Sequence, residues 1–333
     1  MPRILVLGAT GYVGNAVALA LIRANHEVYG LARSSQKAQS LSKQEIIPVE
    51  GSHDSSAAYV ALIESERIDV VIDTTGANDG STQILADVIA AGRARLAAQE
   101  KAGRYPHKLA FIYTSGMWVH GSSAERVSDL DVVGAEFGAK TPGADITAWR
   151  PALEQKILQA RDVLNAVVVR PGIVYGASSS IFTMFLAPLF DAAKSEAPEV
   201  GIPVDPAAVT SLVHVEDLAT AYTALVDKIE LFSSPPFPTP FHSSSSPYPV
   251  FDFCTSVESL AGIFLAAAKE LGYTGKVEFT SREGNVFAQA FSGVLIGDST
   301  RAKTLLGWHP QKTLGMLAGM RVYAHAWAAG YSS

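Results

Sequence analysis

The segment of residues 3–14 constrains the fold of this 333-residue chain more than any other. Residues Ile4–Leu7 form an unbroken apolar run, as expected for a parallel strand buried on both faces. Glycines follow at Gly8, Gly11 and Gly14, and the pattern after them is helical. They permit a tight turn, close approach of the backbone to a pyrophosphate, and close packing of helix on strand. The helix would direct its free N–H groups and positive dipole end at that pyrophosphate, so the segment predicts a dinucleotide site.

Strands and helices continue to alternate through the first half of the chain. Apolar runs predict further buried strands at residues 27–31, 46–50, 68–72, 109–114 and 166–169, with helical stretches at residues 36–43, 55–66, 81–102 and 149–160. This alternation is typical of an α/β fold with a doubly wound parallel sheet and right-handed crossovers.

Beyond Tyr175 the alternation breaks. Residues 177–206 mix small polar residues, apolar residues and prolines, which is typical of an irregular lobe. A strand at 211–215, a helix at 216–228, a strand at 250–254 and a helix from Ser256 to Leu271 follow. We therefore expect residues 1–176 to form a Rossmann domain, to which residues 210–228 and 249–255 return. Residues 177–333 should form mainly a smaller, partly interleaved C-terminal substrate lobe.

Composition excludes several classes of protein. A net charge of −6 and a pI near 5.8 disfavour nucleic acid as a partner, because phosphate binding needs a basic face. No run of 18 or more apolar residues is present, and a strand starting at residue 3 leaves no room for a targeting peptide. The single cysteine, Cys254, excludes an intrachain disulfide and a cysteine-based zinc cluster. We expect a cytoplasmic monomer or homodimer without a metal, and a surface loop in the serine- and proline-rich stretch between Ser233 and Pro249.

The residues after the second strand favour NADP(H) over NAD(H). An NAD-selective fold places a carboxylate there to hold the ribose 2′-hydroxyl, whereas this chain has Ala32 and Arg33. A guanidinium can bind a 2′-phosphate through paired charge-assisted hydrogen bonds, each worth about 1.5–3 kcal/mol, or roughly ten- to a hundredfold in affinity. Ser34, Ser35 and Lys37 could add contacts.

Five motifs in order resemble the extended short-chain dehydrogenase/reductases, a superfamily of NAD(P)-dependent sugar epimerases, dehydratases and ketone reductases. They are the glycine turn at 8–14, the fifth-strand segment Tyr113–Gly121, the turn Arg170–Gly176, the segment Val213–Ala219, and the C-terminal pair Asp298–Ala302 and Leu306–Pro310.

The resemblance implies a set of cofactor contacts. It assigns the pyrophosphate to Gly8, Thr10, Gly11, Tyr12, Val13 and Gly14, the 2′-phosphate to Arg33 with Ser34, and the adenine to Ser52 and His53. It assigns the ribose and nicotinamide side to Thr74, Thr75, Gly76, Ser115, Arg150, Pro171, Gly172 and Val174. His214 and Asp217 would organise the join between lobe and sheet.

The catalytic residues depart from the family pattern. The family has a Ser or Thr five positions before the glycine of the fifth-strand segment, where this chain has Gly116 beside Ser115. The family's Tyr-x-x-x-Lys precedes a glutamate, and anchoring on Glu154 places Arg150 at the lysine and Ile146 at the tyrosine. The proton-relay tyrosine is therefore missing from its usual place, and a positioned acid or base is typically worth about 10²–10⁴ in rate.

Three functions remain open. The first is an NADP(H)-dependent oxidoreductase that reduces a carbonyl or activated double bond with a relocated proton donor: Ser115, Tyr175, His120, Tyr113 or a bound water. The second is a non-redox isomerase, dehydratase or cyclase, and the third a non-catalytic NADP(H)-binding regulatory protein. A lobe rich in apolar residues and poor in cations favours a small apolar metabolite as substrate. Met117 and Trp118 would line its pocket. The apolar residues of the lobe are Ile181, Phe182, Met184, Phe185, Leu186 and Phe190.

Overall fold

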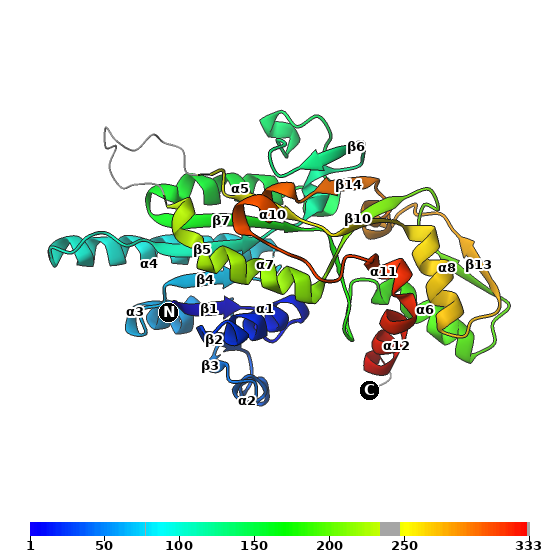
Figure 1. The fold of residues 1–333 in the computed structure, drawn as a ribbon, viewed down its shortest axis with the longest axis horizontal. Helices are drawn as coiled ribbons and strands as arrows, with labels where there is room; N and C mark the ends of the chain where they lie inside the picture. Colours follow the sequence, from blue (N-terminus) through cyan, green and yellow to red (C-terminus); the bar gives the residue numbers. More distant parts are fainter. Residues whose placement is uncertain (77, 234–246, 332–333) are drawn as a thin grey trace.

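The computed structural model describes residues 1–76, 78–233 and 247–331, and most of the loop expected between Ser233 and Pro249 lies outside them. A parallel seven-stranded sheet runs through the molecule in the order β11-β7-β5-β4-β1-β2-β3. Figure 1 labels its strands from β7 to β3 in this order. Its strands are β1 (Arg3–Leu7), β2 (Glu27–Ala32), β3 (Ile47–Glu50), β4 (Val70–Asp73), β5 (Leu109–Thr114), β7 (Leu164–Pro171) and β11 (Val250–Phe253). The order reverses between β1 and β4, where doubly wound sheets bind their ligands.

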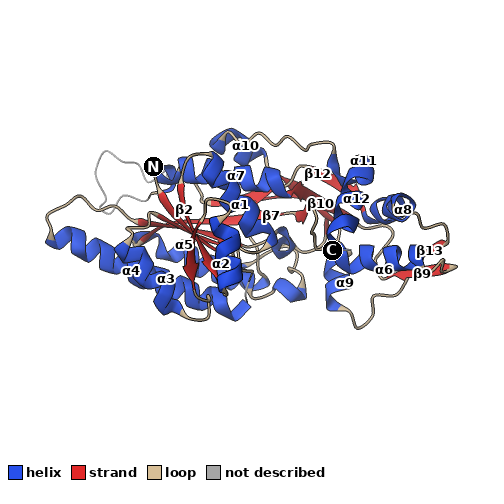
Figure 2. Ribbon diagram, turned by 90° about the horizontal axis from the view of Figure 1, so that it is seen from below, coloured by secondary structure: helices blue, strands red, loops and turns tan. Residues whose placement is uncertain are grey.

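Helices cover both faces of this sheet (Figure 2). On one face α1 (Tyr12–Arg23), α2 (Ser35–Ser42), α7 (Val215–Asp227) and α10 (Thr300–Leu306) share an apolar core with the strands. On the other face lie α3 (Ser56–Ser65), α4 (Asn78–Lys101) and α5 (Arg150–Gln159). The predicted doubly wound α/β fold is confirmed.

The lobe lies beyond the carboxyl ends of the strands and has its own core. It contains the small sheets β12-β10-β8, β13-β9 and β14-β6 and a cluster of buried aromatic rings that includes Phe182, Phe185, Phe264 and Phe291. The strands are β6 (Ser123–Ser128), β8 (Ile173–Tyr175), β9 (Glu199–Ile202), β10 (Val209–His214), β12 (Ser256–Ser259), β13 (Lys276–Phe279) and β14 (Leu295–Asp298). The helices are α6 (Thr183–Lys194), α8 (Leu260–Glu270), α9 (Val286–Phe291), α11 (Gly315–Ala318) and α12 (Met320–Tyr331).

Three local expectations need correction. The stretch 177–206 is not irregular, since it holds α6 and β9. The strand expected at 211–215 pairs with β8 and β12 of the lobe, whereas α7 and β11 contact the main sheet domain. Ser256 begins a strand instead of a helix, because the Oγ atom of Ser259 accepts the N–H of Gly262 and caps α8 three residues later.

None of the helices in the described part of the chain is both long and apolar enough to span a bilayer. Cys254 is buried, and burial raises the pKa of its thiol to about 11. The single cysteine is therefore a packed residue and a weak nucleophile.

Candidate active site

The glycine turn after β1 brings three backbone segments into close contact. Gly8 has a φ of +89°, which favours glycine, and a Cβ atom at Gly14 would lie 2.2 Å from the Gly8 carbonyl oxygen. Thr74 completes the contact, since its Oγ1 atom donates to the Leu7 carbonyl at 2.7 Å. A Cβ atom on Gly11, in contrast, would meet only the Gly8 oxygen, at 3.2 Å.

The turn fits an anionic group. Gly11 is the exposed N-cap of α1, and no side chain of the described residues caps this helix. Its first N–H groups and its positive dipole end are therefore available to a pyrophosphate, which is what the glycine spacing predicts.

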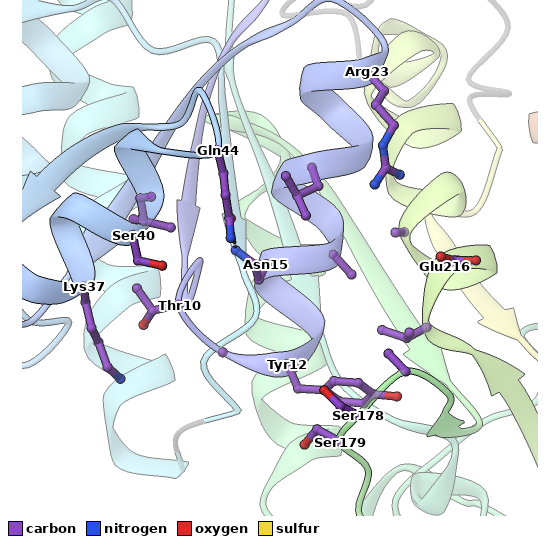
Figure 3. Close-up of a pocket in the computed structure, with 17 residues that line it drawn as sticks. Thr10, Tyr12, Asn15, Arg23, Lys37, Ser40, Gln44, Ser178, Ser179 and Glu216 are labelled. Atoms are coloured by element: carbon purple, nitrogen blue, oxygen red, sulfur yellow. Dashed lines mark hydrogen bonds between the residues drawn. The ribbon is translucent and has the colours of Figure 1, made fainter. Parts of the chain in front are cut away.

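A groove of about 570 Å³ follows α1 away from the turn, between α2 and α7. Figure 3 shows Thr10, Lys37 and Ser40 on one side of it and Glu216 on the other. The Tyr12 hydroxyl donates to the Gly176 carbonyl oxygen at 2.7 Å. Tyr12 thus ties the start of α1 to the loop that enters the lobe.

The expected 2′-phosphate residues lie at the start of α2. Arg33 is exposed and forms no hydrogen bond or ion pair with other described residues. Ser34 caps α2, since its Oγ atom accepts the N–H of Lys37 at 3.4 Å. The Arg33 and Lys37 side chains thus flank a helix N-terminus, and their charges add to its dipole.

The expected adenine and ribose residues are engaged with two neighbouring carboxylates. Ser52 donates to Asp54 at 3.0 Å, and His53 Nε2 lies 3.2 Å from the same carboxylate. The backbone N–H and the hydroxyl of Thr75 both donate to the buried Asp73. Burial raises the pKa of Asp73, although these hydrogen bonds oppose the shift.

A second cavity, of about 580 Å³, joins the start of α1 to the lobe, and we call it the active-site cavity. It brings together most of the residues expected near the nicotinamide and adds some that sequence reasoning missed. Its lining is Tyr12, Val13, Gly76, Ser115, Gly116, Met117, Trp118, Ile146, Thr147, Trp149, Arg150, Pro171, Gly172, Ile173, Val174, Ile181 and Leu295.

Arg150 is the one cation among the described residues that line this cavity. Its Nη1 atom donates to the Thr114 carbonyl at 3.1 Å and to the Tyr113 hydroxyl at 3.3 Å. Its guanidinium carries five N–H donors, so others are left for a ligand oxygen. Ile146 also lines the cavity, where the family register predicts a tyrosine.

Ser115 begins a buried chain of polar groups. Its hydroxyl donates to Glu154, and Glu154 forms a fork with Arg170, whose Nη2 atom lies at 2.5 Å and whose Nε atom lies at 3.1 Å. Burial opposes the charge of Arg170, but Glu154 and Asp252 raise its pKa above the usual value. Beyond them, His120 Nε2 lies 2.8 Å from Asp252. The network fixes the Ser115 side chain through charges that are themselves paired.

The other proposed proton donors lie outside the cavity lining. His120 is buried against Asp252, and the Tyr113 hydroxyl accepts the Arg150 hydrogen bond. Tyr175 is buried in the lobe, where its hydroxyl donates to the Lys312 carbonyl at 3.5 Å and its ring packs edge-on against Tyr323. Burial raises the pKa of Tyr175. The structure therefore brings Ser115 and Arg150, but not Tyr175, to the cavity.

The lobe residues divide between core and cavity. Of the six apolar lobe residues expected to bind substrate, only Ile181 lines the active-site cavity, together with the expected Met117 and Trp118. Phe182, Phe185 and Leu186 are buried in the lobe core. The missed residue Leu295 comes from β14, far away in sequence, where no local pattern marks it. Thr147 and Trp149 lie within the register of Ile146 and Arg150, and that register could have identified them.

His214 and Asp217 join the lobe to the sheet. Asp217 accepts the backbone N–H groups of Gln311 and Lys312 at 2.7 and 2.8 Å, and His214 caps α7. A Cβ atom on Gly176 would lie 2.2 Å from the His214 ring. These contacts support the structural role expected for the two residues.

Comparison with known proteins supports the resemblance inferred from the sequence motifs. The chain is 27% identical over 241 residues to the dTDP-6-deoxy-L-talose 4-dehydrogenase (NAD(P)(+)) of Kitasatospora kifunensis. The matched region covers 70% of this chain and 72% of that protein.

Two solved structures share the fold. The dTDP-glucose 4,6-dehydratase of Bacillus anthracis str. Ames, in complex with NAD, matches with a TM-score of 0.69 at 15% identity, over 99% of this chain and 97% of the other. The UDP-glucose 4-epimerase of Bifidobacterium longum, in complex with NAD⁺ and UDP, matches with a TM-score of 0.64 at 18% identity, over 98% of each chain. A family model for the NAD dependent epimerase/dehydratase family matches residues 4–235. The chain belongs to this family of NAD(P)-dependent enzymes.

Proposed function

We propose that this protein is an NADP(H)-dependent oxidoreductase that reduces a carbonyl or activated double bond of a small apolar metabolite. The observation that carries the proposal is the active-site cavity, which joins the open N-terminus of α1 to a largely apolar wall with a single cation. A diphosphate-linked sugar would need more cations than Arg150 alone provides.

Arg33 and Lys37 support NADP(H) as the cofactor. Both cations stand at the capped start of α2, and Arg33 is left unpaired by the other described residues. A 2′-phosphate there would receive hydrogen bonds from the guanidinium and from helix N–H groups.

Arg33→Asp tests this cofactor assignment. The variant should lose roughly ten- to a hundredfold in affinity for NADP(H) and gain relative affinity for NAD(H), because a carboxylate repels the 2′-phosphate. Arg321→Asp is the matched control, since Arg321 is also exposed but lies on α12 of the lobe, away from the groove along α1. Unchanged relative affinities in Arg33→Asp, measured by calorimetry, would remove Arg33 from the site.

The reaction centre is built from Arg150 and Ser115. NADPH, when bound, supplies the hydride. Arg150 polarises the substrate oxygen with its remaining N–H groups and stabilises the negative charge that develops there. Because the Ser115 hydroxyl donates to Glu154, its oxygen is left to accept a hydrogen bond from a water molecule. That water would give its proton to the substrate oxygen, and the resulting hydroxide would be reprotonated from solvent. Arg150 itself stays protonated and moves no proton.

The decisive experiment measures NADPH oxidation together with product formation for a panel of apolar ketones, aldehydes and enones. We expect stoichiometric conversion, and Ser115→Ala should lower kcat by about tenfold or more, a larger change than its effect on the Kd for NADPH. Product formation without net NADPH oxidation would replace the proposal with an isomerase, dehydratase or cyclase. Tight cofactor binding without any conversion would leave a regulatory NADP(H)-binding protein.

A further inference from the structure

A second, smaller cavity lies directly behind the active-site cavity, and we call it the rear cavity. It has a volume of about 240 Å³, is partly open to solvent, and is lined by residues of the short helix Met117–His120, the loop at residues 142–145, α9 and β14. The residues used below are Trp118, Ala144, Asp145, Ala290 and Leu295.

Trp118 and Leu295 line both cavities. The Trp118 ring packs edge-on against Phe287 and Phe291 of α9, with centroids 5.6 and 6.2 Å away. Its backbone is held separately, since its carbonyl accepts the N–H of Ala144 at 3.0 Å. The indole can therefore be removed without breaking the hydrogen bond that holds the loop.

We propose that Trp118 is the residue that limits substrate size, because it closes off the rear cavity from the active-site cavity. The inference rests on the proposed function and narrows its substrate class to compact apolar carbonyl compounds. The active-site cavity must hold the nicotinamide ring as well as the substrate, so only part of its 580 Å³ is left for the substrate. Trp118 and Leu295, which line both cavities, stand where a longer molecule would pass from this cavity into the rear cavity.

The rear cavity would accept an uncharged apolar extension. Its walls are mostly small or apolar residues and backbone, and Asp145 is the one ionisable side chain among the described residues that line it. A carboxylate at this place repels an anionic tail. Removing the Trp118 ring, the partition between the two cavities, should therefore admit longer alkyl chains and leave phosphorylated ligands excluded.

Trp118→Ala tests the partition with 2-alkanones of increasing length, from 2-butanone to 2-dodecanone. Their binding is measured by calorimetry to the protein saturated with NADP⁺, which has no hydride to donate. Each methylene that enters an apolar cavity should tighten binding about fourfold. In the wild-type protein this gain should stop once the active-site cavity is full, and in Trp118→Ala it should continue over several more methylenes.

Three variants serve as controls. Ile181→Ala removes an apolar side chain that lines only the active-site cavity, so it should weaken binding without extending the usable chain length. Ala290→Phe fills the rear cavity, and added to Trp118→Ala it should abolish the gain for long ketones only. Trp118→Leu, a smaller change, should give an intermediate length limit if the alanine variant does not fold.

Equal length limits in the wild-type protein and both Trp118 variants would overturn the inference. So would a gain that survives Ala290→Phe. Because binding is measured without turnover, these outcomes are separate from the fate of the proposed function, which fails if no ketone, aldehyde or enone oxidises NADPH. A protein that binds alkanones with the expected lengths but never oxidises NADPH would keep the partition and lose the reductase.

Discussion

The nucleotide end and the reaction end of this site differ in which atoms they use. At the glycine turn the important groups are backbone N–H groups and the spaces that missing Cβ atoms leave, as at Gly14 and Gly11. At the reaction end they are side chains, namely Ser115, Arg150 and the apolar Ile146. A backbone site can be lost only through a change of fold or of glycine, whereas a side-chain site changes with single substitutions.

This difference explains how the family's nucleotide site persists beside an altered reaction centre. The strand–turn–helix unit is part of the sheet domain's core, so folding and pyrophosphate binding share the same contacts. Ile146 instead lies at a partly exposed position before α5, where exchange of one side chain leaves the packing intact. Three substitution experiments test this contrast, beginning with the largest expected effect.

Gly14→Ala and Gly11→Ala make the same chemical change three residues apart in the turn. Gly14→Ala should unfold or severely destabilise the protein, by more than about 3 kcal/mol, because its Cβ atom would lie 2.2 Å from a backbone oxygen. Helix propensity alone would favour alanine by about 1 kcal/mol, so a loss must be steric. Urea unfolding followed by circular dichroism measures the difference.

Gly11→Ala should fold normally and lose cofactor affinity. Its φ of −91° suits alanine, and the new methyl group would point into the open face where the pyrophosphate is expected. We expect the Kd for NADP(H) to rise tenfold or more with little change in the urea midpoint. If Gly11→Ala bound the cofactor normally, the pyrophosphate would have to lie elsewhere.

Placing a tyrosine at position 146, where the family pattern has one, tests the reaction end of the site. Ile146→Tyr combined with Arg150→Lys recreates the family's Tyr-x-x-x-Lys pair in a cavity that already holds both positions. On the best apolar ketone, kcat should rise by about 10², since a positioned acid is typically worth 10²–10⁴. Ile146→Phe with Arg150→Lys supplies the ring without the hydroxyl and should give no such gain. Equal rates for the two double variants would mean that the existing centre already has an efficient proton donor.

Local patterns predicted the sheet domain well because its signals are local. Apolar runs and glycines marked each strand of the main sheet, and its helices other than α10, to within a few residues. The lobe was predicted less well. α6 was missed because Pro188 interrupts its helical pattern, and β12 was missed because its pairing with β10 joins residues about fifty positions apart.

The residues of the site likewise differ in how well the sequence predicts their places. The glycine turn and the place of Arg150 followed from spacing. Thr10, Gly11, Tyr12, Val13 and Arg150 line a cavity, whereas Gly8 and Gly14 line neither of the two. Tyr175 could not be placed correctly, since its strand directs it into the lobe core beside Tyr323. Leu295 reaches the cavity only because β14 pairs with β6, a contact that no local pattern predicts.

The smallest expected effect lies at Asp73, the last residue of β4. Its buried carboxylate accepts hydrogen bonds from Thr75 and Ser81, and burial raises its pKa from the usual 3.8. A raised pKa means that the stability Asp73 contributes is fully present below pH 3.8 and is lost as the pH rises through the folded-state pKa.

Asp73→Asn keeps an acceptor for Thr75, gains a donor toward Ser81 and removes the charge. At pH 8 it should therefore raise the free energy of unfolding by on the order of 1 kcal/mol, an advantage that shrinks toward pH 4. Asp191→Asn, an exposed change on α6, should show no such trend in urea unfolding at the same pH values. A variant less stable than the wild-type protein at pH 8 would show that the Asp73 charge itself holds the strand end in place.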